Sequence, residues 1–139
     1  MTGNPIVINE IYECSIKKLW NALTNPEAMR DWYFEINELE LEKGFEFEFY
    51  AGKYLHHCVI KEVNLYKKLI YTWSYPMYEG YSIVEFDLNA ISDEFTQLVF
   101  THEGIVSFPI DDPNFSRNSF EAGWNELLRI ALKAYVEID

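Results

Sequence analysis

The chain has 139 residues, of which 49% are hydrophobic, 17% aromatic and 24% charged, which is typical of one globular domain with a substantial core. Its formal net charge of −12 disfavours nucleic acid and anionic membranes as partners. No apolar run is long enough to span a bilayer and no export signal is apparent. We therefore expect a single cytoplasmic domain over residues 1–139, without membrane insertion.

The first part of the chain predicts a strand and two helices. Residues 6–13 (IVINEIYE) are rich in the β-branched residues that favour strands. Ser15 can cap a helix, and a second helix can be capped by Asn25 followed by proline, or by a capping box of Thr24 and Glu27. Four apolar residues of the first helix share one face: Ile16, Leu19, Trp20 and Leu23.

From residue 38 the hydrophobic period changes from that of a helix to that of a strand. Residues 38–49 (ELELEKGFEFEF) alternate on both sides of Lys43-Gly44, which predicts a hairpin with a tight turn. The apolar–polar alternation indicates an antiparallel sheet with one solvated face. The expected total is seven strands, the last four over residues 54–63, 68–75, 81–90 and 94–104.

The C-terminal segment, residues 111–138, predicts one long helix entered through Asp112-Pro113 and Ser116. About two dozen helical residues would span roughly 36 Å, enough to cross a small sheet. The predicted fold class is α+β: a curved, seven-stranded antiparallel sheet wrapped around a long C-terminal helix, with two short helices after the first strand. Apolar side chains recur along the helix at Phe120, Trp124, Leu127, Leu128, Ala131 and Tyr135.

Gly123 stands inside this predicted helix, where glycine costs about 1 kcal/mol relative to alanine. Two explanations compete. The glycine can let the helix approach the sheet closely, or it can leave room for a ligand beneath Trp124. Close packing is the explanation we expect.

The sequence Thr101-His102-Glu103-Gly104 resembles a general base beside its orienting carboxylate. Neighbouring side chains of a strand point to opposite faces, so His102 faces inward with Leu98 and Phe100 while Glu103 faces outward. The two cannot act on one substrate unless a β-bulge at the glycine reverses the alternation. His102 alone remains a catalytic candidate. We expect instead that His102 and His56 are core histidines whose hydrogen bonds are satisfied by tyrosine hydroxyls or backbone groups.

The same alternation predicts a cavity between sheet and helix, with an aromatic lining and a few polar groups, as is usual for a small-molecule site. Segments 75–81 and 105–115 lack periodicity and are expected at its mouth as a lid. His56, Cys58 and His102 could converge on a metal, but the spacing of known metal motifs is absent, so we expect no metal and no cofactor. The predicted lining consists of Trp32, Phe47, Phe49, His56, Cys58, Tyr71, Trp73, Phe100, His102, Phe120 and Trp124.

Five motifs occur in a characteristic order: residues 20–26 (W-x-A-L-T-N-P), Trp32-Tyr33, Tyr71-Thr72-Trp73, residues 101–104 (T-H-E-G) and Gly123-Trp124. Together they resemble the activator of heat-shock-protein ATPase homologue-like family of the START / Bet v 1-like (SRPBCC) superfamily. The resemblance implies the helix-grip fold, with one strand, two helices, six strands and a long helix. It also implies a deep cavity that in the superfamily holds lipids, sterols, polyketides and other apolar molecules, but no single activity.

The sequence is compatible with three functions. The first is binding of a hydrophobic or aromatic small molecule, lipid-like or polyketide-like, without chemistry. The second is an enzyme of the cyclase or hydrolase type that uses His102 with a tyrosine as proton donor. The third is a stress- or chaperone-related interaction module, although eukaryotic co-chaperones of the family carry a further N-terminal domain and this sequence starts at the first predicted strand. Outward-facing apolar residues would permit a homodimer: Ile70, Ile83 and Val99.

Overall fold

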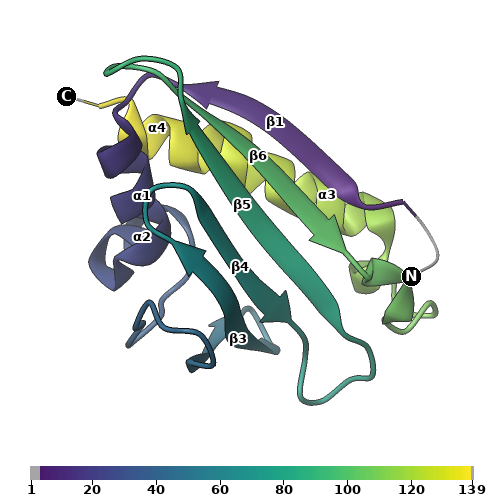
Figure 1. Ribbon diagram of the computed structural model, residues 1–139. Helices are drawn as coiled ribbons and strands as arrows, with labels where there is room; N and C mark the ends of the chain where they lie inside the picture. The colour runs from purple at the N-terminus through teal and green to yellow at the C-terminus, as the bar shows by residue number, and fades with distance from the viewer. Residues whose placement is uncertain (1–3, 139) are drawn as a thin grey trace.

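An antiparallel sheet with a long helix packed along one face dominates the computed structural model, which describes residues 4–138 (Figure 1). The strands follow the spatial order β1-β6-β5-β4-β3-β2, so β1 and β2 form the two edges. Consecutive strands from β2 to β6 are neighbours, as expected for a meander. The strands are β1 (Ile6–Tyr12), β2 (Glu46–Ala51), β3 (Tyr54–Asn64), β4 (Lys68–Trp73), β5 (Ser82–Ala90) and β6 (Thr96–Glu103).

Two short helices lie after β1 and contact the C-terminal end of the long helix. The first, α1 (Ile16–Thr24), begins at Ser15, whose side chain accepts a hydrogen bond from the backbone N–H of Lys18 at 3.1 Å. The second, α2 (Pro26–Trp32), begins at Asn25, whose side chain accepts from the second helical residue at 3.0 Å. The preceding threonine donates its hydroxyl within α1, so the alternative capping box does not form.

The prediction of seven strands is wrong, because residues 38–42 form no strand and six strands are present in the described chain. In the predicted hairpin, the glutamates of both arms would have faced each other on one side of the sheet, and like charges directly opposite are destabilising. Leu39 is half-buried and packs against the core, whereas Leu41 is exposed, so only part of the apolar side of this alternation reaches the core. The chain instead reaches β2 through a turn at Gly44, whose φ is 93°.

The predicted C-terminal helix is present but is less regular than expected. A short 3₁₀ turn (Pro113–Phe115) precedes α3 (Arg117–Asn125), and a π-helical segment (Glu126–Ala131) joins α3 to α4 (Leu132–Val136). The helix begins at Ser116, as predicted, since its side chain accepts from the backbone N–H of Ser119 at 3.1 Å. Phe115 and the residues before it belong to the preceding turn.

The π-helical segment explains the spacing of the buried residues on this helix. The fully buried side chains stand four apart, and in a regular α-helix each such step rotates the side chain by about 40° around the axis. A segment with i→i+5 hydrogen bonds turns less per residue and counteracts that rotation. One face of the helix therefore stays against the sheet along its whole length through Phe120, Trp124, Leu128, Leu132 and Val136.

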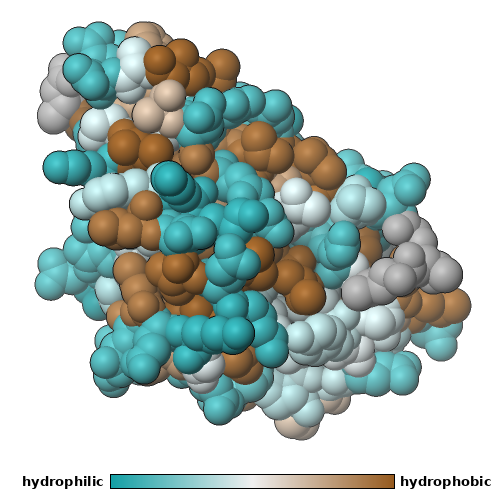
Figure 2. Space-filling view, in the orientation of Figure 1, coloured by the Kyte–Doolittle hydropathy of each residue, from teal (hydrophilic) through white to brown (hydrophobic). Residues whose placement is uncertain are grey.

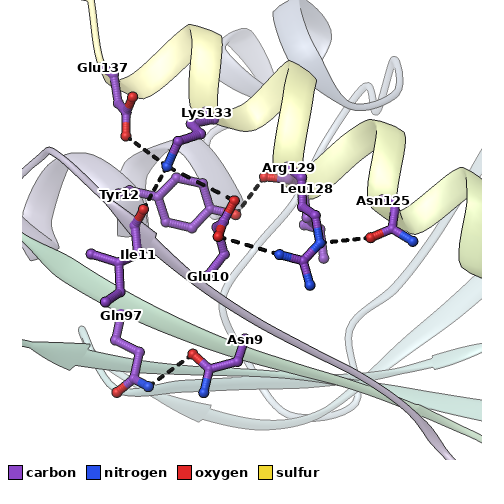
Figure 3. A network of polar contacts seen from close by, with 10 residues as sticks. All are labelled: Asn9, Glu10, Ile11, Tyr12, Gln97, Asn125, Leu128, Arg129, Lys133 and Glu137. Carbon is purple, nitrogen blue, oxygen red and sulfur yellow. Dashed lines mark hydrogen bonds and ion pairs between the residues drawn. The ribbon is translucent and has the colours of Figure 1, made fainter.

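Polar contacts fasten the C-terminal half of the helix to the edge strand β1 (Figure 3). The buried hydroxyl of Tyr12 donates to the carbonyl of Leu128 at 2.6 Å, and burial raises the pKa of that hydroxyl. Lys133 donates to the carbonyl of Ile11 at 2.7 Å. Arg129 lies 3.4 Å from Glu10. The contact from Lys133 occupies a backbone carbonyl of an edge strand that would otherwise be free to pair with another chain.

The alternation of side chains on β6 is as predicted. Leu98, Phe100 and His102 are buried toward the helix, while Glu103 is exposed. After it the chain leaves the sheet at Gly104, whose φ of 97° is readily adopted by glycine.

The opposite face of the sheet carries both polar and apolar side chains, scattered among each other rather than gathered in one patch (Figure 2). Ile70, Ile83 and Val99 lie on this face and are half-buried. The homodimer suggested by these residues stays a prediction. Among residues 4–138, no helix has both the length and the apolar character needed to cross a membrane.

Candidate functional site

A pocket of about 260 Å³ opens between α3 and the ends of β3 and β4 that lie beneath it. Its lining includes three residues without a polar side chain: Ala51, Gly123 and Leu127. Three polar side chains also border it, those of His56, Asn114 and Ser119. Aromatic rings make up most of the wall. They belong to Phe34, Tyr54, Trp73, Tyr75, Phe115, Phe120 and Trp124.

Four of the eleven residues predicted to line a cavity border this pocket: His56, Trp73, Phe120 and Trp124. The predicted inward orientation holds for the remaining residues, but their side chains are packed into the core. Phe100 contacts Trp124 with ring centroids 4.2 Å apart, and the Tyr71 hydroxyl lies 2.6 Å from that of Tyr33. The free space is therefore confined to one end of the interface. The packed residues are Trp32, Phe47, Phe49, Cys58, Tyr71, Phe100 and His102.

His102 is fully buried, and both of its ring nitrogens are bonded. The indole N–H of Trp124 donates to Nδ1 at 3.0 Å, so Nδ1 carries no proton in this pair. The proton of the neutral ring is then on Nε2, which donates to the Ser82 hydroxyl at 2.8 Å. That hydroxyl in turn donates to the carbonyl of Trp73 at 2.6 Å.

This chain of hydrogen bonds crosses from the helix through β6 and β5 to β4. Burial lowers the pKa of His102 to about 3, so the ring is neutral at physiological pH. The expectation of a core histidine with satisfied hydrogen bonds fits this geometry, with a tryptophan and a serine as partners. No nitrogen of His102 is left to exchange a proton with a ligand.

The same expectation is only half met by His56, because only one of its nitrogens is bonded. Its Nδ1 donates to the carbonyl of Tyr54 at 3.0 Å, and its ring stacks on Phe49 with centroids 4.7 Å apart and Trp73 edge-on at 4.8 Å. Burial lowers the pKa of His56 to about 4, although the carbonyl groups of Tyr54 and Phe49 oppose that shift. The ring is therefore neutral at physiological pH, with its acceptor nitrogen at Nε2.

The Nε2 atom of His56 is the unbonded end of a ring that borders the pocket. None of the hydrogen bonds found in residues 4–138 engages it. In the same part of the chain, every fully buried side-chain nitrogen or oxygen has a hydrogen-bond partner. An atom without a partner is therefore not fully enclosed by protein, and His56 borders the pocket.

Each of the two segments predicted at the mouth contributes at least one residue to the pocket wall. Tyr75 of the first and Phe115 of the second both line the pocket, with ring centroids 4.9 Å apart. Gly80 allows the segments to meet, because a Cβ atom at this position would lie 2.3 Å from the ring of Phe108. Whether the rim moves as a lid stays a prediction.

Hydrogen bonds hold this rim to the sheet. The Tyr54 hydroxyl, at the start of β3, donates to a carboxylate oxygen of Asp112 at 3.3 Å. The same hydroxyl accepts from the side-chain amide of Asn114 at 2.8 Å. The segment that precedes the long helix is thereby tied to the strand on the far side of the pocket.

The expectation that Gly123 serves close packing is wrong. A Cβ atom built at this position meets no atom within 4 Å, apart from its own helix backbone and chain neighbours, and the residue borders the pocket. The structure thus supports the other explanation, in which the missing side chain leaves space beside Trp124.

Several lining residues were not expected from the sequence. Ser119, Gly123 and Leu127 stand four apart on α3 and the start of the π-helical segment, so a helical wheel centred on the glycine could have found them. Phe34 lies in an irregular segment after α2, where no period predicts which way a side chain points. Tyr75 and Phe115 also come from irregular segments.

Solved structures with the same fold include two whose chains are about as long as this one. Protein CV1439 from Chromobacterium violaceum is 21% identical with a TM-score of 0.78, and the match covers 98% of this chain and 99% of that one. Protein BH1534 from Bacillus halodurans is 22% identical with a TM-score of 0.78, covering 96% and 97%. DynU16, a protein of the dynemicin biosynthetic locus, is 17% identical with a TM-score of 0.77, covering 98% of this chain and 48% of that one.

At these identities the likeness shows a shared fold and carries no activity from one protein to the other. No curated protein sequence matches significantly. The protein-family comparison matches residues 13–137 to the activator of Hsp90 ATPase homolog 1-like proteins. The match covers nearly the whole chain and agrees with the motif order in the sequence, so the chain belongs to the activator of Hsp90 ATPase homolog 1-like family.

Proposed function

We propose that this protein binds an apolar, aromatic small molecule in the pocket beneath α3, and that it does so without transforming it. The observation that carries the proposal is a pocket of about 260 Å³ with seven aromatic side chains in its wall and a glycine where a helix would ordinarily place a side chain. An engineered apolar cavity of about 150 Å³ holds benzene. The space here therefore suits a molecule of one or two rings.

The chemistry of the lining favours binding over acid–base catalysis. Among residues 4–138, no aspartate, glutamate, lysine or arginine borders the pocket. Its one histidine, His56, is neutral at physiological pH because burial lowers its pKa to about 4, and burial raises the pKa of the Tyr75 hydroxyl. General acid–base catalysis works best with groups whose pKa lies near the working pH. The lining offers shape, apolar surface and hydrogen bonds instead.

The test fills the pocket from the helix side. Gly123→Leu places a side chain into the free volume while replacing a poor helix former by a good one, so the variant is expected to fold. The matched control is Ala122→Leu, at the neighbouring exposed position, which does not border the pocket. Binding of 2-naphthol is measured by quenching of tryptophan fluorescence, since Trp73 and Trp124 both line the site.

The wild type and Ala122→Leu are expected to bind 2-naphthol with the same affinity, and Gly123→Leu to lose binding by at least roughly tenfold because its side chain occupies the same space. The proposal fails if the wild type binds neither 2-naphthol nor its methyl analogue. It also fails if Gly123→Leu binds as well as the wild type. Native mass spectrometry of the purified protein, followed by organic extraction, would identify a ligand retained from the cell.

A further inference from the structure

The pocket contains one polar atom that has a fixed direction and no partner, the Nε2 atom of His56. Its ring is held by the Tyr54 carbonyl on one side and by the Phe49 ring against its face. The ring cannot turn to exchange its nitrogens without losing the Nδ1 hydrogen bond. Nε2 is therefore a positioned acceptor that opens onto the pocket.

The other polar groups of the wall are either exposed at the rim, as are the side chains of Asn114 and Ser119, or already have a partner. The Tyr75 hydroxyl accepts from the indole N–H of Trp73 at 2.9 Å. The Tyr54 hydroxyl is bonded to Asp112 and Asn114. Among the described residues, His56 therefore offers a ligand a buried acceptor of fixed orientation, surrounded by aromatic rings.

These features define the ligand by its chemistry. A group that satisfies Nε2 must be a hydrogen-bond donor, because a bare imidazole nitrogen only accepts. An anionic ligand is disfavoured, because no cationic side chain borders the pocket and Asp112 stands at its rim. A cage of aromatic rings favours an aromatic body over an aliphatic one.

Building on the proposed function, we propose that the ligand is a neutral phenol-like molecule of one or two rings, whose hydroxyl donates to His56 Nε2 while its rings pack against Phe34, Trp73 and Trp124. These three residues border the pocket, and Phe34 and Trp73 also contact the His56 ring, with centroids 6.1 Å and 4.8 Å from it. The hydroxyl and the rings are thus bound by adjoining parts of one wall.

A matched pair of probes tests this assignment. 2-Naphthol and 2-methylnaphthalene have nearly the same shape, but only the first can donate a hydrogen bond. The quantity of interest is the affinity for 2-naphthol divided by that for 2-methylnaphthalene. Comparing this ratio between variants cancels the difference in the probes' solubility in water.

His56→Phe keeps an aromatic ring against Phe49 and removes the acceptor. The affinity ratio is expected to fall roughly tenfold, the size of one hydrogen bond to a positioned acceptor. The control is His57→Phe, the same substitution at the next residue, whose ring faces outward and pairs with Glu46 at 2.9 Å. This control is expected to leave the ratio unchanged.

The outcomes separate the two proposals. If the wild type binds both probes and His56→Phe leaves the ratio unchanged, the phenol assignment is wrong and the binding function stands. If the wild type binds neither probe, the binding function fails and the assignment fails with it. Should His56→Phe not fold, ¹⁵N NMR of the wild type decides: the His56 Nε2 resonance must shift on adding 2-naphthol and not on adding 2-methylnaphthalene, and an equal response overturns the assignment.

Discussion

The two ends of the interface between helix and sheet are built on different principles. At the C-terminal end, the hydroxyl of Tyr12 and the ammonium group of Lys133 join the helix to β1 through backbone carbonyls. At the other end, α3 faces aromatic rings across a pocket beside Gly123. One end is closed by hydrogen bonds, and the other retains space because a side chain is missing.

The two buried histidines express the same contrast. His102 also lies beneath α3, but it does not border the pocket, and both of its nitrogens are bonded within the protein. His56 lies at the pocket and has one nitrogen bonded. Since an unpaired buried polar group is costly, the free nitrogen is tolerated only where solvent or a ligand can reach it. The difference between the histidines thus marks where the molecule is structural and where it can bind.

The largest effect is expected from His102→Ala. The substitution removes a fully buried ring, leaves the indole N–H of Trp124 without a partner and takes away the donor to the Ser82 hydroxyl. The free energy of unfolding should fall by about 4 kcal/mol. His56→Ala, which breaks one hydrogen bond and widens an existing pocket, should cost about half as much. Urea denaturation measures both, and equal losses would contradict the contrast between the two sites.

Sequence reasoning predicted that both histidines face inward but did not distinguish one from the other. The alternation of β6 correctly placed His102 inward and Glu103 outward, because the period of a strand is fixed by covalent geometry. Alternation does not give the distance between helix and sheet at each position of a strand. Tyr71 and Phe100 were therefore expected to line a cavity, although other rings pack against them. That distance depends on the path of the helix and on irregular segments such as the one that carries Phe34.

The predicted seventh strand, which is absent, shows a second limit of prediction from the sequence. The glutamates of residues 38–48 alternate as a hairpin requires, and the period alone indicated two strands. Repulsion between the facing carboxylates is a pairwise effect that a period does not contain. Likewise, the sequence shows Gly123 only as a glycine inside a helix. Its surroundings in the structure were needed to decide between close packing of the helix and free space beside Trp124.

Measuring stability as a function of pH tests whether both buried histidines are neutral in the folded protein. The pKa values of His102 and His56 are lowered to about 3 and about 4 in the folded protein, so below pH 6.5 the unfolded chain binds more protons and the folded state loses stability. Between pH 6.5 and 5 the two histidines together should remove about 3 kcal/mol from the free energy of unfolding.

The double variant His102→Gln, His56→Phe should lack this loss, because both titrating groups are gone while the carboxylates are unchanged. The measurement is urea denaturation of the wild type and the double variant at matched ionic strength across this range of pH. An identical pH dependence in the two proteins would show that the histidines are not held neutral in the folded state.

Tyr12→Phe probes the closed end alone. The variant keeps the ring but removes the hydrogen bond to the carbonyl of Leu128, which should lower the free energy of unfolding by about 1.5 kcal/mol. Affinity for 2-naphthol should not change, because the pocket lies at the other end of the helix. Tyr50→Phe, at an exposed position of β2, is the control and should alter neither property. A loss of binding in Tyr12→Phe would show that the two ends are coupled.

The smallest effect, from Gly123→Ala, has the opposite sign. Alanine favours the helix and its Cβ meets no atom, so the free energy of unfolding should rise by about 1 kcal/mol. The same methyl group narrows the pocket and should weaken binding of 2-naphthol. Gly44→Ala is the contrasting control, since its surroundings are equally open but its φ of 93° is unfavourable for alanine, so stability should fall and binding should persist. A gain in stability with a loss of binding at position 123 would mean that the glycine serves the pocket rather than the fold, whereas unchanged binding would leave that space without a function.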